Sequence, residues 1–356
     1  MPKIIVMNAS TEQMSGGDPN SNLRLLAAKT AWRSAWFANN DDIIISPVPI
    51  QSNFLNYIGN TLNFDPSTVR VITTDQLGAE FIITDELLLS PSVMKHLKLY
   101  TRYSDQWQIM PCYFTEGVAE CAVQLGITDM PGQRFAAQRQ RGCDLLNRKS
   151  HFRQLAVGAG LPLAEGSIVD TPNRLAKAIR KHLRKTGIVI VKTDNGAGGM
   201  GNITLTKQST SPLAGSRETR KTSIDIEAMA VDLWSEMTNS WCQTLVVESY
   251  YEASHIFYLE YSILDDGSPS FLNSGTIRLK SDSNPAAKEL VWLGLEIPAE
   301  VPAFSFAKVL NYGVRFVEVA ANIGYRGPLN IDVIVTDTNQ IIFNEVNARW
   351  GGIYHA

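Results

Sequence analysis

Short apolar runs alternate with amphipathic stretches over the first third of the chain. The apolar runs are the length of buried strands, and the stretches between them space their apolar residues as helices do. The predicted strands are 3–7, 43–45, 69–73, 81–83 and 107–113, and the predicted helices are 23–37 and 116–125. This alternation is typical of a parallel α/β layer. We therefore predict an α/β domain over residues 1–135.

The middle of the chain changes from helical patterning to a pair of strands joined by glycines. Residues 134–160 are basic and predict helix, and residues 174–184 predict a further helix. A buried-type strand at 188–191 and a returning strand at 203–206 enclose a loop with four glycines between 194 and 202. This order predicts a hairpin whose tip consists mostly of small residues.

The last part of the chain reads as helices and longer strands. Residues 208–223 are polar and predict a mobile loop. The predicted helices are 226–237 and 304–324, and the predicted strands are 244–247, 256–264 and 271–280. Two apolar runs, 331–335 and 341–343, flank the turn residues 336–339, which predicts a hairpin or two neighbouring strands.

Composition limits the class of protein. The 356 residues exceed what one ordinary core supports, so we expect two or three subdomains. A hydrophobic fraction of 44% and a formal net charge of -3 are ordinary for a globular protein and do not favour nucleic acid as a partner. No run reaches the roughly 20 apolar residues of a membrane helix, and the first residues lack a signal peptide pattern. We therefore expect a cytoplasmic protein that does not engage a membrane.

The cysteines and histidines lack the spacing of disulfide frameworks or zinc sites. The four cysteines are scattered without C-x-x-C pairing, and the five histidines show no metal-ligand spacing. They fit buried thiols of a reduced compartment better than structural zinc.

The glycine-rich loop is the first candidate for chemistry. Lys192 ends the strand before the loop, and small residues let backbone N–H groups approach phosphate oxygens. The loop is not a Walker A loop, because no helix follows it directly, and the chain has no G-x-G-x-x-G after its first strand. An ordinary β-turn is the simpler alternative, although such a turn needs only one or two glycines.

The hairpin near the end of the chain is the second candidate. Glu345, Asn347 and Arg349 follow one another at every second position and would share a face of one strand, while Asp332 interrupts the preceding apolar run. Pairing of the two strands would gather two carboxylates, a carboxamide and a guanidinium, which suits Mg²⁺ and phosphate oxygens. The alternative is an edge hairpin with a charged solvent face.

Taken in order, these residues resemble the ATP-grasp ligases. The likeness covers residues 141–352 and rests on Lys149 in a helix, Lys192, the glycine loop, an acidic strand at 248–251, and the final Asp332 with Glu345-x-Asn347-x-Arg349. It implies an α/β chain with α+β lobes: an ATP-grasp fold preceded by a Rossmann-like pre-ATP-grasp domain. The implied domains are 1–135, a small lobe at 136–250 and a large lobe with the metal site at 251–356.

The resemblance also implies the cofactors and the roles of individual residues. ATP would be bound with Mg²⁺, or Mn²⁺ in its place, held by Asp332, Glu345 and Asn347. Arg349, together with Arg278 and Arg326, would stabilise negative charge during catalysis. Nucleotide contacts would come from Lys149, Lys192, Gly196, Gly198, Gly199, Met200, Gly201, Glu248, Ser249, Tyr250 and Tyr251. His255 or Glu252 would contact the ribose, and the sequence does not decide between them.

The implied reaction joins a carboxylate to an amine through an acyl phosphate. The N-terminal part looks like the N-terminal domain of the pheganomycin-type peptide ligases, on residues 8–10, 22, 32–36, 41–45, 54, 55 and 57. This likeness would make an amino acid and an amino acid or peptide the substrates. Such ligases continue beyond the segment that ends here at Ala356, so the site for the acceptor amine is left open. A homodimer is left open as well.

Two other functions share this pattern. One is an ATP-grasp carboxylase or phosphoryl-transfer enzyme, and the other is a nucleotide-binding regulator without catalysis. The joint presence of Lys192, Asp332, Glu345, Asn347 and Arg349 argues against the inactive regulator.

Overall fold

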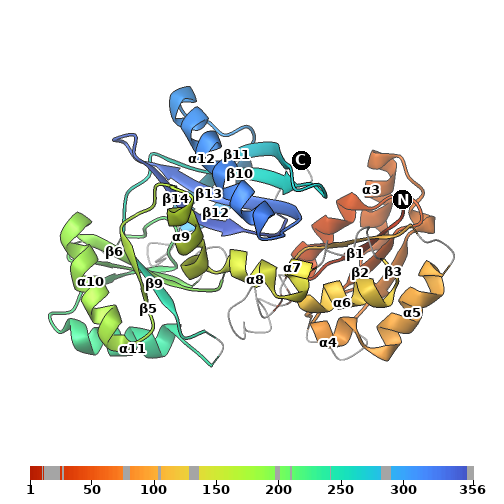
Figure 1. Cartoon of the computed structure of the whole chain (residues 1–356), viewed down its shortest axis with the longest axis horizontal. Coiled ribbons are helices and arrows are strands. Elements are labelled where there is room, and N and C mark those ends of the chain that lie inside the picture. The colour runs from red at the N-terminus through yellow and green to blue at the C-terminus, as the bar shows by residue number, and fades with distance from the viewer. Residues whose placement is uncertain are drawn as a thin grey trace. The chain divides into compact units, whose positions relative to one another are not determined.

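A computed structural model describes most of the chain and divides it into two compact units. It describes residues 1–9, 11, 25, 28–74, 81–102, 106–127, 136–196, 201–208, 211–240, 242–281 and 290–350. The first unit contains Met1–Asp144 and Ile323–Tyr325, and the second contains Leu145–Asn322 and Arg326–Gly351. Each unit is considered by itself below (Figure 1).

The first unit is built on a parallel four-stranded sheet, which confirms the predicted α/β layer. The strands run in the order β3-β2-β1-β4, and their bounds are β1 Lys3–Val6, β2 Ile43–Ser46, β3 Arg70–Thr73 and β4 Gln108–Pro111. The strand predicted at 81–83 is wrong. Phe81 has a φ of +62°, in the left-handed region that a strand does not use.

Helices cover both faces of this sheet. One face packs Ile5 and Ile44 against η1 (Ala31–Phe37) and α3 (Ser52–Leu62), and the other packs Ile4 and Ile43 against three helices. Those three are α4 (Asp85–Leu88), α5 (Pro91–Thr101) and α6 (Glu116–Gln124). The short elements η2 (Pro66–Thr68) and α7 (Ala136–Arg139) also belong to this unit, and α8 (Gly142–Asn147) crosses its boundary. The predicted helix at 23–37 ends as a 3-10 helix, and four of its residues, 23, 24, 26 and 27, lie outside the described residues.

The second unit contains a first five-stranded sheet with helices on one face. Its order is β5-β9-β6-β7-β8, with β5 Gly166–Val169, β6 Ile188–Thr193, β7 Asn202–Thr206, β8 Glu218–Lys221 and β9 Leu245–Ser249. Val189, Val191 and Val247 pack on α10 (Pro172–Thr186) and α11 (Ile226–Met237). Alternation along β6 therefore turns Lys192 to the opposite face. The loop predicted at 208–223 is wrong in part, because β8 pairs there in parallel with β7.

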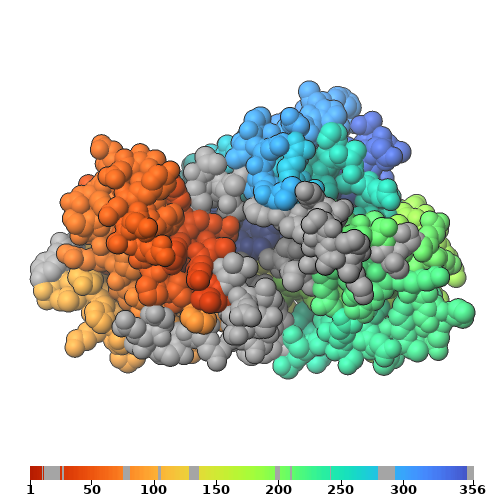
Figure 2. Space-filling model, turned by 180° about the vertical axis from the view of Figure 1, so that it is seen from behind, coloured from red at the N-terminus to blue at the C-terminus, as the bar shows by residue number. Residues whose placement is uncertain are grey.

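The second sheet of this unit carries the candidate metal residues. Its order is β12-β11-β10-β13-β14, with β10 His255–Ile263, β11 Pro269–Ser281, β12 Leu290–Glu296, β13 Gly327–Val335 and β14 Ile341–Asn347. Helix α12 (Ala303–Asn322) packs on one face, where Gly313 lies against Leu259 and Tyr261. The outer side of α12, blue in Figure 2, belongs to the molecular surface. The odd-numbered residues of β10 and β13 thus face α12, and Asp332 faces away from it.

Within the described part of the chain, no helix has the length and apolar character needed to span a membrane.

Candidate active site

Strands β13 and β14 bring Asp332, Glu345 and Asn347 onto one face. Asp332 pairs with Glu345, and Asn330 pairs with Asn347. The register shifts by one residue between Asp332 and Val333, so Asn344 is an extra residue in β14. Without this bulge, Phe343 and Glu345 would share a face, since side chains alternate along a strand. The bulge lets Phe343 stay in the core while Glu345 turns toward Asp332.

The two carboxylates are close enough to affect each other. Asn347 Nδ2 donates to Asp332 Oδ2 at 3.3 Å. Burial and the negative charge of Glu345 raise the pKa of Asp332 well above its usual value. Burial also acts to raise the pKa of Glu345, but the ammonium groups of Lys149 and Lys192 outweigh it and hold that pKa below the usual value. The cluster would therefore be stabilised by added positive charge.

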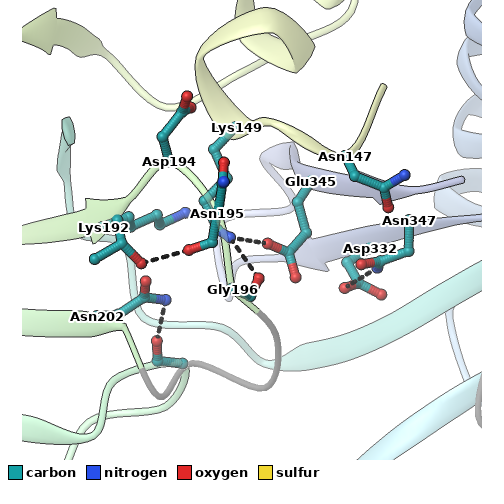
Figure 3. A network of polar contacts seen from close by, with 12 residues as sticks. Asn147, Lys149, Lys192, Asp194, Asn195, Gly196, Asn202, Asp332, Glu345 and Asn347 are labelled. Atoms are coloured by element: carbon teal, nitrogen blue, oxygen red, sulfur yellow. Dashed lines mark hydrogen bonds and ion pairs between the residues drawn. The ribbon is translucent and has the colours of Figure 1, made fainter. Parts of the chain in front are cut away.

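The first residues of helix α9 (Lys149–Gly158) contact Asp194, the residue after β6, and Lys149 points toward this cluster. The backbone N–H groups of Lys149 and Ser150 donate to the carbonyl oxygen and to Oδ1 of Asp194, at 3.0 and 2.7 Å. A carboxylate at this position caps the helix and interacts favourably with its dipole. Lys149 Nζ lies 3.1 Å from Glu345 Oε2 and 3.0 Å from the carbonyl oxygen of Gly196 (Figure 3). Asp194 thereby positions a lysine that comes from a different element.

The second lysine is held by a buried glutamate. Lys192 Nζ lies 2.6 Å from Glu248 Oε2, and Arg153, one helical turn after Lys149, pairs with the other oxygen of Glu248. Burial raises the pKa of Glu248, but Lys192 and Arg153 outweigh it and leave the pKa below the usual value. The Glu248 side chain is thus occupied by two cations, which does not support its predicted contact with adenine.

The glycine-rich loop is closed at its base by Thr193. Its backbone N–H donates to the carbonyl oxygen of Gly201 at 3.1 Å, and a Cβ on Gly201 would lie only 2.0 Å from Thr193 Oγ1. Gly196 has a φ of +120°, which residues with a side chain rarely adopt. Both positions therefore require glycine. The predicted phosphate contacts Gly198, Gly199 and Met200 lie outside the described residues.

The side chains of the predicted nucleotide contacts Ser249, Tyr250 and Tyr251 point in different directions. Ser249 lies on the helix-covered face, and its hydroxyl donates to the carbonyl oxygen of His182 at 3.3 Å. Tyr250 donates to the carbonyl oxygen of Ala214 at 3.2 Å, and Tyr251 donates to Glu165. These side chains are engaged within the protein, so a base at this segment would be recognised mainly by its backbone.

Arg349 lies beside the carboxylate cluster and is fixed by a residue that sequence reasoning missed. Asn147 Oδ1 accepts from Arg349 Nη1 at 2.6 Å and from the backbone N–H of Ala348 at 3.1 Å. The Arg349 charge acts to lower the pKa of Asp332 and of Glu345. The only sequence signal for Asn147 is its place two residues before Lys149. Many polar residues occur at helix ends, so this place alone does not single it out.

Three predicted residues are not brought to the cluster. Arg326 precedes β13 and donates to the carbonyl oxygens of Asp265 and Ala321, six residues and about 20 Å of extended strand from Asp332. Arg278 is exposed and pairs with Glu296 and Glu300. By register, both Arg278 and His255 share the face of Phe257, which is the face of α12.

The side chains of Asp332, Glu345 and Asn347 suit a metal ion whose remaining ligands come from a nucleotide and water. No group of three or more His, Cys, Asp or Glu suited to a metal occurs among the described residues, and Asp332 and Glu345 supply only two carboxylates. Asn347 adds a carboxamide. Mg²⁺ is usually held by one or two carboxylates together with phosphates and water, so this donor set suits a metal–nucleotide complex rather than an all-protein site.

Comparison with known proteins identifies a family domain within the first unit. Residues 31–127 match the family model described as "Pre ATP-grasp domain". The sequence matches no curated protein significantly.

Solved structures resemble the chain over nearly its whole length. Biotin carboxylase from Campylobacter jejuni is 15% identical, with a TM-score of 0.60 over 99% of this chain and 66% of that one. D-alanyl-alanine synthetase A from Vibrio cholerae is 13% identical, with a TM-score of 0.55 over 97% of this chain and 88% of that one. L-amino acid ligase from Bacillus licheniformis is 13% identical, with a TM-score of 0.50 over 99% of this chain and 68% of that one. The chain has an ATP-grasp fold preceded by a pre-ATP-grasp domain.

All the residues that converge belong to the ATP-grasp part. Lys149, Lys192, Asp332, Glu345 and Arg349 lie within the second unit. The predicted division of that unit into lobes at residue 250 falls between its two sheets and stays a prediction. The ATP-grasp fold thus has one set of lysines and carboxylates drawn from α9, β6, β13 and β14.

Proposed function

We propose that this protein is an ATP-dependent ligase that joins a carboxylate to an amine. One observation carries the proposal: two buried lysines from α9 and β6 converge with an Asp–Glu–Asn cluster from β13 and β14, on an ATP-grasp fold. Lysines suit the phosphates of a nucleotide, and carboxylates suit the metal that accompanies them. An inactive regulator would have no need to keep both groups.

The reaction needs an activated carboxylate. An oxygen of the donor carboxylate attacks the γ-phosphorus of ATP, the bond to the β–γ bridging oxygen breaks, and ADP leaves. The amine nitrogen of the acceptor then attacks the carbonyl carbon of the acyl phosphate. The C–O bond to phosphate breaks, the nitrogen loses a proton to solvent, and inorganic phosphate leaves with the amide formed.

The protein contributes charge and position to both steps. Lys149 and Lys192 would neutralise phosphate oxygens, and Arg349, held by Asn147, would stabilise the charge that develops on the transferred group. Asp332, Glu345 and Asn347 would hold Mg²⁺. When bound, the metal would supply Lewis-acid stabilisation of the phosphate oxygens. Glu248, itself paired with Arg153, would hold Lys192 in position.

We further propose that both substrates are amino acids or short peptides. The support is the likeness of the N-terminal motifs to peptide ligases, and the fold similarity to an L-amino acid ligase and a D-alanyl-alanine synthetase. The alternative is a carboxylase, since biotin carboxylase has the same fold.

The test is ADP release from ATP and Mg²⁺ in the presence of single amino acids, amino acid pairs and dipeptides. The expected result is ADP release that requires both an acid and an amine, with a product whose mass is the sum of the two less one water. Donor labelled with ¹⁸O in its carboxylate should transfer one labelled oxygen to phosphate. ADP release with bicarbonate alone would refute the ligase and favour the carboxylase.

A further inference from the structure

Polar side chains continue from the metal cluster across the same face of the sheet. Register puts Asn273, Glu260, Asn330 and Asn347 side by side on β11, β10, β13 and β14. This polar row lies next to the pair Asp332 and Glu345. Glu260 is fully buried and Asn330 is 7% exposed, so both are placed where an unsatisfied polar group is costly.

Hydrogen bonds link the row to the metal cluster in one direction. Asn330 Nδ2 donates to Glu260 Oε2 at 2.8 Å. Asn347 Nδ2 lies 3.5 Å from Asn330 Oδ1, a long bond, and 3.3 Å from Asp332 Oδ2. In these three contacts, the NH₂ of Asn330 points toward Glu260, and the NH₂ of Asn347 points toward Asn330 and Asp332.

This direction follows from the chemistry of the groups. A carboxylate only accepts, whereas a carboxamide has an NH₂ that donates and an oxygen that accepts. Glu260 therefore requires the NH₂ of Asn330, which turns the Asn330 oxygen toward Asn347. Asn347 must then present its own NH₂, and its carbonyl oxygen is left for another partner. A metal ion binds the oxygen of a carboxamide and not its NH₂.

We propose that Glu260 and Asn330 are positioning residues that fix the orientation of the Asn347 carboxamide for metal binding. The proposal rests on the metal site of the proposed function. Removing a residue that hydrogen-bonds to a metal ligand commonly weakens metal affinity by about 10- to 100-fold. Glu260 lies two strands away from Asn347, on the strand next to that of Asp332, and touches no reacting atom.

The test measures Mn²⁺ binding by electron paramagnetic resonance in the presence of ADP, for Glu260→Gln and Asn330→Leu. Glutamine can donate to Asn330 as well as accept, so the direction is no longer fixed. Each variant should bind Mn²⁺ about 10- to 100-fold more weakly, while ADP binding in EDTA stays unchanged. The double variant should be no worse than the weaker single variant, because the residues act through one chain of bonds.

A matched control comes from the same row. Asn273→Leu changes the same residue type, but Asn273 accepts from the Tyr258 hydroxyl at 3.0 Å and is one strand further from the metal ligands. It should keep wild-type Mn²⁺ affinity. In turnover, raising Mg²⁺ should restore kcat for Glu260→Gln, which a general loss of structure would not allow.

Unchanged Mn²⁺ affinity in folded Glu260→Gln would overturn the proposal, and so would a wild-type protein that binds no Mn²⁺ with ADP. Should Asn330→Leu fail to fold, the nearly isosteric Glu260→Gln decides alone. If the variants lose Mn²⁺ affinity but the wild-type protein forms no amide, the ligase proposal is refuted and the positioning role of Glu260 and Asn330 is supported. If the wild-type protein forms an amide but the variants bind Mn²⁺ normally, the positioning role is refuted and the ligase proposal is supported.

Discussion

At the scale of residues, the site is an arrangement of buried charges that partly compensate each other. Glu248 is neutralised by Lys192 and Arg153, and Glu345 by Lys149. Asp332 has no ion pair with a lysine or arginine among the described contacts, and its pKa is raised by burial and by Glu345. The site thus keeps one carboxylate whose charge a bound cation would stabilise.

Removing Glu345 should abolish turnover without unfolding the protein. Glu345→Ala takes away one of two carboxylates for the metal, and we expect kcat to fall by at least about 10²- to 10³-fold. Steady-state ADP release measures this, and circular dichroism checks the fold. Glu227→Ala, at an exposed position of α11 where the carboxylate pairs with Arg180, is the matched control and should keep full activity. Near-normal turnover of Glu345→Ala would remove the metal assignment.

Removing the charge of Glu248 should destabilise the protein at neutral pH. Glu248→Gln leaves Lys192 and Arg153 buried without their counterion, which should cost about 3–5 kcal/mol of unfolding free energy. The measurement is urea unfolding at pH 7, with exposed Glu227→Gln as a control that should change little. A variant as stable as the wild type would show that the two cations do not depend on Glu248.

The same substitution should change how stability depends on pH. The pKa of Glu248 is lowered in the folded protein, so the carboxylate stabilises the fold above its unfolded value near 4.5 and loses this contribution as pH falls through the folded value. The difference in unfolding free energy between wild type and Glu248→Gln should therefore shrink as the pH falls below about 4.5. An equal difference at pH 7 and pH 3 would contradict the assignment.

At the scale of elements, the site depends on the hydrogen bonds that hold the start of α9 against the end of β6. Lys149 is the first residue of α9, and its position follows from the Asp194 cap at the end of β6. The hairpin of β13 and β14 contributes in a similar way through the bulge at Asn344. Helix α9 and the hairpin thus each combine functional side chains with a local feature that orients them.

Loss of the Asp194 cap should weaken nucleotide binding. Asp194→Ala removes the side-chain acceptor of the Ser150 N–H, which should cost about 0.5–2 kcal/mol of stability and let Lys149 move. We expect a higher KM for ATP and a lower melting temperature. Asp194→Asn is the matched control, because asparagine caps helices about as well as aspartate and should restore both values. If Asp194→Asn is impaired as much as Asp194→Ala, the negative charge of Asp194 matters and its hydrogen bond to the helix does not.

At the scale of the whole molecule, every converging residue belongs to the second unit. The first unit supplies a separate parallel sheet with its own two cores, and the family domain at 31–127 lies within it. The two units therefore have different roles in the proposed function: the second holds the nucleotide machinery.

Nucleotide and metal should stabilise the second unit in particular. A non-hydrolysable ATP analogue with Mg²⁺ at 100 times its Kd should stabilise the binding unit by about 2.7 kcal/mol. Hydrogen exchange should slow most in the segments 147–153, 188–196 and 330–349. Adding EDTA should remove most of the effect on 330–349, where the carboxylates lie. Slower exchange elsewhere, with none in these segments, would place the nucleotide at another site.

The sequence by itself determined the class of fold and most of the candidate site residues. Strand–helix alternation predicted the parallel layer, and the glycine loop beside Lys192 with the polar hairpin of Asp332 and Glu345 supplied the candidates for nucleotide and metal binding. These features are local, because a strand's alternation and a loop's glycines can be recognised from neighbouring residues. Phe81 and residues 218–221 show the limit: Phe81 takes a left-handed backbone inside a predicted strand, and residues 218–221 form a strand by pairing with residues 203–206.

Only the tertiary structure decided which polar side chains meet. A regular strand would put Phe343 and Glu345 on one face, and the bulge at Asn344 separates them. Arg278 and Arg326 were predicted to act together with Arg349, but strand register and position leave them elsewhere. Glu248 pairs with Arg153 and Lys192, which lie 95 and 56 residues before it in the chain. Asn147 accepts a hydrogen bond from Arg349, which follows it by 202 residues. Such pairings depend on register and on partners far apart in the chain, and periodicity along the sequence contains neither.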